Sequence, residues 1–163
     1  MSEAKSVDAV IPLIGLMQAR PPLPKDERRR RQEEYFRVAF SRMVSSGQTY
    51  GEATGAPGTA ITTTDSVEFR KNLQSIDNDL VEQVRIVTEG VNHYFAHGEF
   101  PAPYYAWRIA VILRKLKEVK LESDFLGAFN RLCEGCVGGR YSDLVMREVK
   151  SRRLAALASS DGG

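Results

Sequence analysis

Two pairs of side chains in this sequence have the types and the spacing of metal ligands. His93 and His97 are four residues apart, so they share one face of a predicted helix. Cys133 and Cys136 have the two-residue gap that is typical of a zinc knuckle. These four are all of the histidines and cysteines in the chain. They predict a tetrahedral zinc site if an up-and-down bundle brings both pairs to the same pole.

A second interpretation of the same four residues needs no metal. A histidine near the C-terminal end of a helix is often only a favourable partner of the helix dipole. An isolated Cys-x-x-Cys pair is often two small buried thiols. The histidines also precede the cysteines, which matches no common zinc motif. We favour this second interpretation and expect no cofactor.

The sequence contains no pattern that is typical of an enzyme. It lacks a Gly-x-Ser-x-Gly nucleophile motif, a Walker phosphate loop and a dinucleotide-binding glycine fingerprint. The glycine-rich run from 135 to 139 follows a predicted helix rather than a strand, so it is a poor candidate for a phosphate cradle. With two histidines and scattered carboxylates, no acid–base constellation stands out. We therefore expect a protein that is not an enzyme.

Basic residues cluster locally although the formal net charge is only +2. Residues 99–155 contain eleven basic and seven acidic side chains, a net charge of +4, whereas 65–98 contain three basic and six acidic ones, a net charge of −3. Basic clusters bind phosphates with little regard to base sequence. The residues that we predict to contact a nucleic-acid backbone are Arg28, Arg29, Arg30, Arg31, Lys115, Lys117, Arg152 and Arg153.

The same charge pattern has two other interpretations. Runs of alternating charge are commonly a solvated helix face, and Glu27–Arg31, Arg29–Glu33 and Arg30–Glu34 are all spaced to pair along one helix. Segregated acidic and basic faces also suit head-to-tail self-association.

The hydrophobic pattern predicts an all-α protein, an irregular bundle of about five helices. Apolar residues recur every three or four positions in several stretches. The longest is a single helix from a capping box at Asp65–Glu68 to about Ala96, and a glycine-rich loop at 46–64 precedes it. The other expected helices cover 26–45, 103–120, 122 to about 134, and 142–158.

The N-terminal 24 residues are expected to be an apolar arm on a proline hinge. Pro21, Pro22 and Pro24 cannot continue a helix, so they separate the arm from a bundle domain at 25–158 and a disordered tail at 159–163. An apolar segment on a hinge can dock in the groove of another chain. The predicted partner-binding residues are Ile11, Leu13, Ile14, Leu16 and Met17.

The sequence favours a cytoplasmic protein with no membrane segment. No stretch approaches 18 uninterrupted apolar residues. The apolar run at 10–17 follows acidic residues and is not followed by a small-residue cleavage site, so we expect no signal peptide. Two cysteines do not make a disulfide framework, which favours a reducing compartment.

These observations lead to one functional hypothesis and one alternative. We expect a non-enzymatic helical building block that forms homo-oligomers or joins a larger assembly and contacts a nucleic-acid backbone. Viral or phage nucleocapsid-like proteins and subunits of ribonucleoprotein assemblies are of this kind. The alternative is a protein-binding adaptor or regulator that docks through the apolar N-terminal segment.

Overall fold

The computed structural model describes residues 3–49, 52–53 and 67–162. Within these residues all regular structure is helical and no strand is present, which confirms the predicted all-α class. None of the described helices is both long enough and apolar enough to cross a bilayer. The helices are α1 (Glu3–Asp8), α2 (Val10–Gln18), α3 (Lys25–Ser46), α6 (Val67–Ile76), α7 (Leu80–His97), α8 (Pro103–Lys115), α9 (Val119–Leu132) and α10 (Gly139–Ser160).

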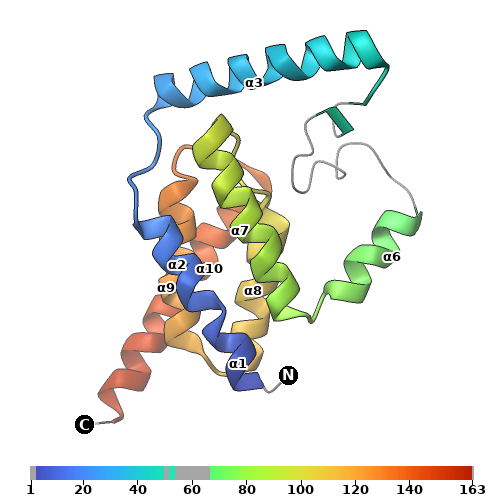
Figure 1. The fold of residues 1–163 in the computed structure, drawn as a ribbon. Helices are drawn as coiled ribbons and strands as arrows, with labels where there is room; N and C mark the ends of the chain where they lie inside the picture. The colour runs from blue at the N-terminus through green and yellow to red at the C-terminus, as the bar shows by residue number, and fades with distance from the viewer. Residues whose placement is uncertain (1–2, 50–51, 54–66, 163) are drawn as a thin grey trace.

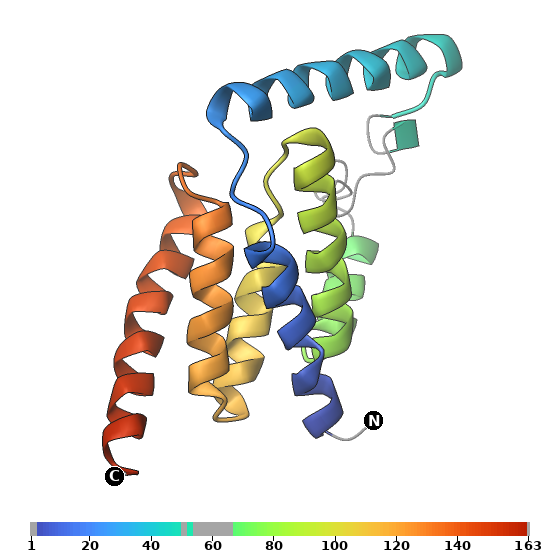
Figure 2. The ribbon, with the colours of Figure 1, turned by 60° about the vertical axis from the view of Figure 1, so that its left-hand side comes forward.

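Helices α2, α7, α8 and α9 pack side by side, and α10 covers the outer side of α9 and part of α8 (Figures 1 and 2). Short connections join α7 to α8 and α8 to α9, so each pair is antiparallel. The core lies between these helices and is built from their inward-facing apolar residues. Its largest fully buried side chains include Tyr94, Phe125, Phe129, Leu113 and Ile109.

The N-terminal segment is a helix of this bundle rather than a detachable arm. Val10, Leu13 and Met17 are at most 2% exposed, and they join the same hydrophobic core as α7 and α9. Their four-residue and three-residue spacing gives α2 one apolar stripe, and the bundle has room for that stripe between α7 and α9. Leu13 and Met17, two of the predicted partner-binding residues, are therefore already buried within this chain.

Helix α3 lies across one end of the bundle, close to the C-terminal end of α7 (Figure 1). Helix α3 approaches the bundle closely at Gly98. This glycine follows α7 and has a φ of +77°. A Cβ atom at this position would approach the carbonyl oxygen of Arg28 to 2.4 Å, so only glycine fits there. The Gln32 side-chain amide also donates a hydrogen bond to the Gly98 carbonyl, at 2.9 Å. The proline-containing link at 19–24 thus ends in a helix that is held in place.

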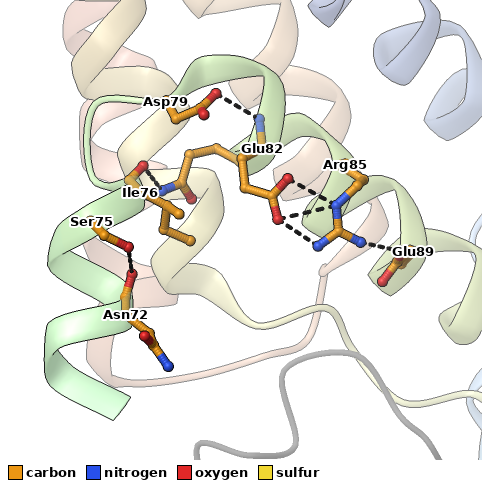
Figure 3. A network of polar contacts seen from close by, with 8 residues as sticks. Asn72, Ser75, Ile76, Asp79, Glu82, Arg85 and Glu89 are labelled. Atoms are coloured by element: carbon orange, nitrogen blue, oxygen red, sulfur yellow. Dashed lines mark hydrogen bonds and ion pairs between the residues drawn. The ribbon is translucent and has the colours of Figure 1, made fainter. Parts of the chain in front are cut away.

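The single helix expected from 65 to 96 is two helices, α6 and α7, separated at residues 77–79. The predicted continuity was wrong because Asp77, Asn78 and Asp79 favour turns and caps over helix interiors. Asp79 ends the break as the N-cap of α7, and its carboxylate accepts a hydrogen bond from the Glu82 amide at 3.0 Å (Figure 3). Helix α6 consequently leaves the line of α7 and projects from the side of the bundle (Figure 1).

Two predicted features are placed differently or lie outside the described residues. The capping residue Asp65 and most of the glycine-rich loop at 46–64 are not among the described residues. The predicted tail at 159–163 begins inside a helix, because α10 continues to Ser160.

Candidate interaction surfaces

The predicted nucleic-acid residues fall into two groups at opposite ends of the bundle. Arg28–Arg31 lie on α3, beside the C-terminal end of α7. Lys115 and Lys117 lie at the C-terminal end of α8, and because α7 and α8 are antiparallel this is the other end of the molecule (Figure 2). Arg152 and Arg153 lie in the C-terminal half of α10, which runs toward that same end. The eight residues therefore do not form one surface.

Two of the four consecutive arginines hold α3 onto the bundle. The Arg28 guanidinium lies over the Phe100 ring, 4.3 Å from its centroid. The Arg31 guanidinium donates a hydrogen bond to the Phe95 carbonyl and pairs with Glu27 at 2.8 Å. These two side chains are only partly exposed. Their main role in this structure is intramolecular.

Arg29 and Arg30 are exposed but have acidic neighbours within one turn. Arg30 pairs with Glu27 at 2.7 Å, and Arg29 lies 3.8 Å from Asp26. Hydrogen bonds from Arg31 and then Arg30 lower the pKa of the Glu27 carboxyl. The sequence interpretation as a salt-bridged helix face describes this cluster better than a phosphate-binding patch does, although the expected pairing of Arg29 with Glu33 is replaced by Asp26.

In the second group, at the C-terminal ends of α8 and α10, most of the basic side chains are exposed and not engaged in ion pairs with the described residues. Lys115, Lys117 and Arg153 are exposed, and within the described parts of the chain they have no ion pair. Arg152 pairs with Glu148 one turn before it. This end of the bundle is therefore the better candidate for binding an anion.

The four predicted zinc ligands do not form a metal site. His93 and His97 lie together, with ring centroids 4.8 Å apart, and His97 stacks on Tyr35 of α3 at 4.0 Å. Cys133 instead belongs to the buried core at the end of α9. Among the described residues no group of three or more His, Cys, Asp or Glu side chains is arranged to hold a metal ion. Helices α7, α8 and α9 alternate in direction as expected, so the histidine pair and the cysteine pair lie toward the same end of the bundle. Side chains at the same end are not necessarily in contact.

The histidine pair belongs to the joint between α3 and α7. Burial, and then the neighbouring His93, lower the pKa of the His97 imidazole. The His93 ring nitrogen lies 3.0 Å from a carboxylate oxygen of Glu99. A surface cavity of about 460 Å³ adjoins this joint and is lined by Arg31, Glu34, Tyr35, Val38, Arg42, Ala96 and His97.

A buried ion triad was missed in the sequence. Glu122 is fully buried, and its carboxylate accepts hydrogen bonds from Arg114 of α8 at 2.6 Å and Arg147 of α10 at 2.7 Å. The Arg147 guanidinium also lies over the Trp107 ring, 5.2 Å from its centroid. The signal was available, because Glu122 precedes Phe125, Leu126 and Phe129 at core spacing. The triad joins three helices, and each of its charges has a partner.

A polar network caps the start of α7 (Figure 3). Glu82 pairs with Arg85 at 2.5 Å, and Arg85 also pairs with Glu89 along the same helix. The buried Gln83 amide donates to the Ile76 carbonyl at 2.8 Å, which ties the end of α6 to α7. A shallow cavity of about 610 Å³ lies beside this cap. Each interaction in the network is local to the α6–α7 break, so we assign it a structural role.

Several exposed apolar side chains lie on α10. Its inner face carries the buried Leu144 and Ser151 and packs on α9. The rest of the helix surface carries five exposed apolar side chains, of which Leu154 lies next to the packed face, three residues after Ser151. They are Val145 (51% exposed), Met146 (63%), Val149 (47%), Leu154 (41%) and Leu157 (62%). We call these five residues, together with Lys150 and Arg153 that lie among them, the α10 outer face.

The fold and these surfaces define an all-helical protein whose last helix packs on α9 and leaves several apolar side chains exposed. Comparison with protein-family models, with curated proteins and with solved structures found no match to this chain.

Proposed function

We propose that this protein is a non-enzymatic helical building block that self-associates and contacts a nucleic-acid backbone through the α10 outer face. The supporting observation is that five exposed apolar side chains lie on a helix that already packs on α9. Exposed contiguous apolar patches of this kind mark interaction sites. Burying them against another copy releases apolar surface from water, which favours association.

The nucleic-acid part of the proposal depends on the cations at the same end of the molecule. Lys150 and Arg153 lie within the α10 outer face, and Lys115 and Lys117 lie at the neighbouring end of α8. A phosphate chain that contacts such residues releases its condensed counterions, which is the main source of non-specific affinity. The arginines of α3 contribute less, because Arg28 and Arg31 already bind groups of the bundle.

Light scattering of the purified chain, with and without a single-stranded oligonucleotide, tests this proposal. We expect the wild-type mass to rise above that of a monomer, and Val149→Glu to abolish the rise because it places a carboxylate in the apolar face. Ile11→Glu is the matched control, since Ile11 is 57% exposed on α2 and lies away from α10. A wild-type chain that stays monomeric under both conditions contradicts the proposal.

A second candidate function is a protein-binding adaptor, and the outer side of α3 favours it. Phe40 (54% exposed) and Val44 (71%) lie on this helix, which contacts the bundle mainly through α7. Of the predicted contact residues in the N-terminal segment only Ile11 is well exposed, so we place the adaptor surface on α3 instead. Two results together would favour the adaptor. The chain would fail to self-associate, and it would bind a partner protein whose binding is abolished by Phe40→Glu but not by Val149→Glu.

A further inference from the structure

The turn that follows α9 places two cysteines close enough to form a disulfide. The backbone amide of Cys136 donates a hydrogen bond to the Cys133 carbonyl at 3.0 Å, and both thiols are free in this structure. Gly135, the third residue of the turn, has a φ of +94°, a conformation that favours glycine. The Cα atoms at the two ends of such a turn lie less than about 7 Å apart, and disulfides span about 4.4–6.8 Å between Cα atoms.

We propose that Cys133 and Cys136 are a redox modification site, which a small-molecule disulfide such as glutathione disulfide converts to an intramolecular disulfide. The proposal is independent of self-association and of nucleic-acid binding. Because thiol–disulfide exchange is reversible, the pair is a dithiol or a disulfide according to the ratio of oxidised to reduced small molecule around it.

The two thiols differ in exposure, and this difference sets the order of the reaction. Cys133 is 5% exposed and belongs to the hydrophobic core, whereas Cys136 is only partly buried. The turn also borders a surface cavity of about 380 Å³ whose lining includes Gly135, Lys25 and Arg28. A dissolved disulfide therefore reaches Cys136 first, and Cys133 reacts only with a sulfur that is already attached to the protein.

The surroundings of the pair do not stabilise a thiolate. Burial raises the pKa of the Cys136 thiol, and the Arg28 guanidinium partly opposes this shift. Burial, and then Cys136, raise the pKa of the Cys133 thiol well above its usual value. Both residues follow the C-terminal end of α9, where the helix dipole disfavours negative charge. A dithiol with a stabilised thiolate gives an easily reduced disulfide, so this pair should give one that resists reduction.

The reaction is an exchange in two steps. The Cys136 thiolate, its proton lost to water, attacks one sulfur of glutathione disulfide, which forms a mixed disulfide and releases one glutathione thiolate. Cys133 then loses its proton and attacks the Cys136 sulfur, which releases the second glutathione. The two cysteines are oxidised by two electrons in total, and glutathione disulfide is reduced to two glutathione thiols.

Intact-mass spectrometry of the full chain tests the proposal, after incubation in glutathione buffers of increasing oxidised fraction and an acid quench. We expect the wild-type mass to fall by that of two hydrogen atoms, with no dimer on a non-reducing gel. The equilibrium constant for closure should be about tenfold or more larger in the folded chain than in urea, because the folded turn already holds the cysteines together. Free thiols at every oxidised fraction, a mixed disulfide that never closes, or equal constants in buffer and in urea would overturn the proposal.

Single variants separate the two roles. Cys133→Ala keeps the more exposed thiol and should stop at the mixed disulfide, gaining the mass of one bound glutathione. Cys136→Ala is the matched control and should stay unmodified over the same time, because Cys133 is buried. Equal rates of glutathione addition in the two folded variants would overturn the assigned order of attack.

The order of attack can also be measured without a substitution, and circular dichroism shows whether the variants are folded. Brief labelling of the reduced wild-type chain with iodoacetamide, followed by tandem mass spectrometry of its peptides, should find Cys136 alkylated before Cys133. Labelling of Cys133 first, or of both residues at equal rates, would overturn the assigned order.

Discussion

Glu122 shows how a single residue can join three helices. Its carboxylate is fully buried, while the Arg114 and Arg147 side chains that bind it are 32% and 18% exposed. Arg147 gains a further acceptor in the Ala110 carbonyl, at 3.3 Å. Burying one acid between two arginines is costly in desolvation, and the hydrogen bonds and ion pairs must offset that cost. The pairing explains why a charged residue occupies a core position of α9.

Replacing Glu122 with glutamine should destabilise the fold. The substitution keeps the shape but removes the charge that both arginines face, and breaking a buried pair of this kind costs about 3 kcal/mol. Urea unfolding followed by circular dichroism measures the change in the free energy of unfolding. Asp124→Asn is the control, because the exposed Lys120–Asp124 pair on the same helix is worth less than about 1 kcal/mol. Equal losses in the two variants would contradict this account of the triad.

At the scale of elements, α3 packs on the bundle mainly against α7. Polar and ring interactions of residues 28–35 contribute to this attachment. Tyr35 stacks on His97 and meets the His93 ring edge-on at 5.0 Å. The imidazole of His97 is thus part of the contact between α3 and α7.

Acid should loosen α3 from α7. Burial and the neighbouring His93 lower the pKa of His97 below the 6.5 of an exposed histidine, so the docked state favours the neutral ring. The contribution of His97 to the free energy of docking is fully present above pH 6.5. It is lost as the pH falls through the pKa that His97 has in the docked state. Protonated His97 would face Arg31 of α3 and His93, while Glu99 partly offsets the charge.

The NMR shifts of the Tyr35 ring protons report this change, because the ring current of His97 acts on them only while the rings are stacked. We expect the shifts to move toward those of an exposed tyrosine between pH 7 and pH 5. In the double variant His93→Gln/His97→Gln, which has neither imidazole beside Tyr35, the shifts should be flat over the same range. Tyr35 shifts of the wild-type protein that do not change over this pH range would refute the proposed pH dependence of α3 docking.

At the scale of the whole molecule, the predicted nucleic-acid residues lie at two ends of the bundle, and this changes how they are best tested. Replacing Arg28–Arg31 together would remove the Arg28 and Arg31 contacts that hold α3, so a loss of binding would not report charge alone. Arg29 and Arg30 are exposed, and among the described residues their ion pairs lie within α3, which makes them the cleaner pair.

Nucleic-acid affinity should depend on the α8–α10 end more than on α3. In Lys150→Gln/Arg153→Gln, affinity for single-stranded DNA should fall, and the plot of log K against log salt should become shallower by about 1 to 2, because two phosphate contacts are lost. Arg29→Gln/Arg30→Gln removes the same charge and should change the slope little. Fluorescence anisotropy titrations at several salt concentrations measure both slopes. A larger effect from the α3 pair would place the phosphate contacts on α3.

The sequence by itself determined the helical class and the position of most helices. The three-to-four spacing of apolar residues predicted α3 closely, as 26–45 against Lys25–Ser46, and it placed α8 to α10 within a few residues. These features are local, because a helix forms its hydrogen bonds within its own segment. The helix that was predicted as continuous from 65 to about 96 breaks at Asp77–Asp79, where local turn chemistry overrides the apolar pattern on both sides.

Only the tertiary structure decided which faces are buried and which remain exposed. Periodicity showed that residues 10–17 have an apolar stripe, but whether α7 and α9 leave room for it depends on how distant helices pack. The same limit applies to the histidines and cysteines, which share an end of the bundle without meeting. It also applies to α10, whose exposed apolar side chains are recognised as such only once its packed residues are known. Sequence spacing fixes which residues share a helix face, whereas contact depends on the packing of segments far apart in the chain.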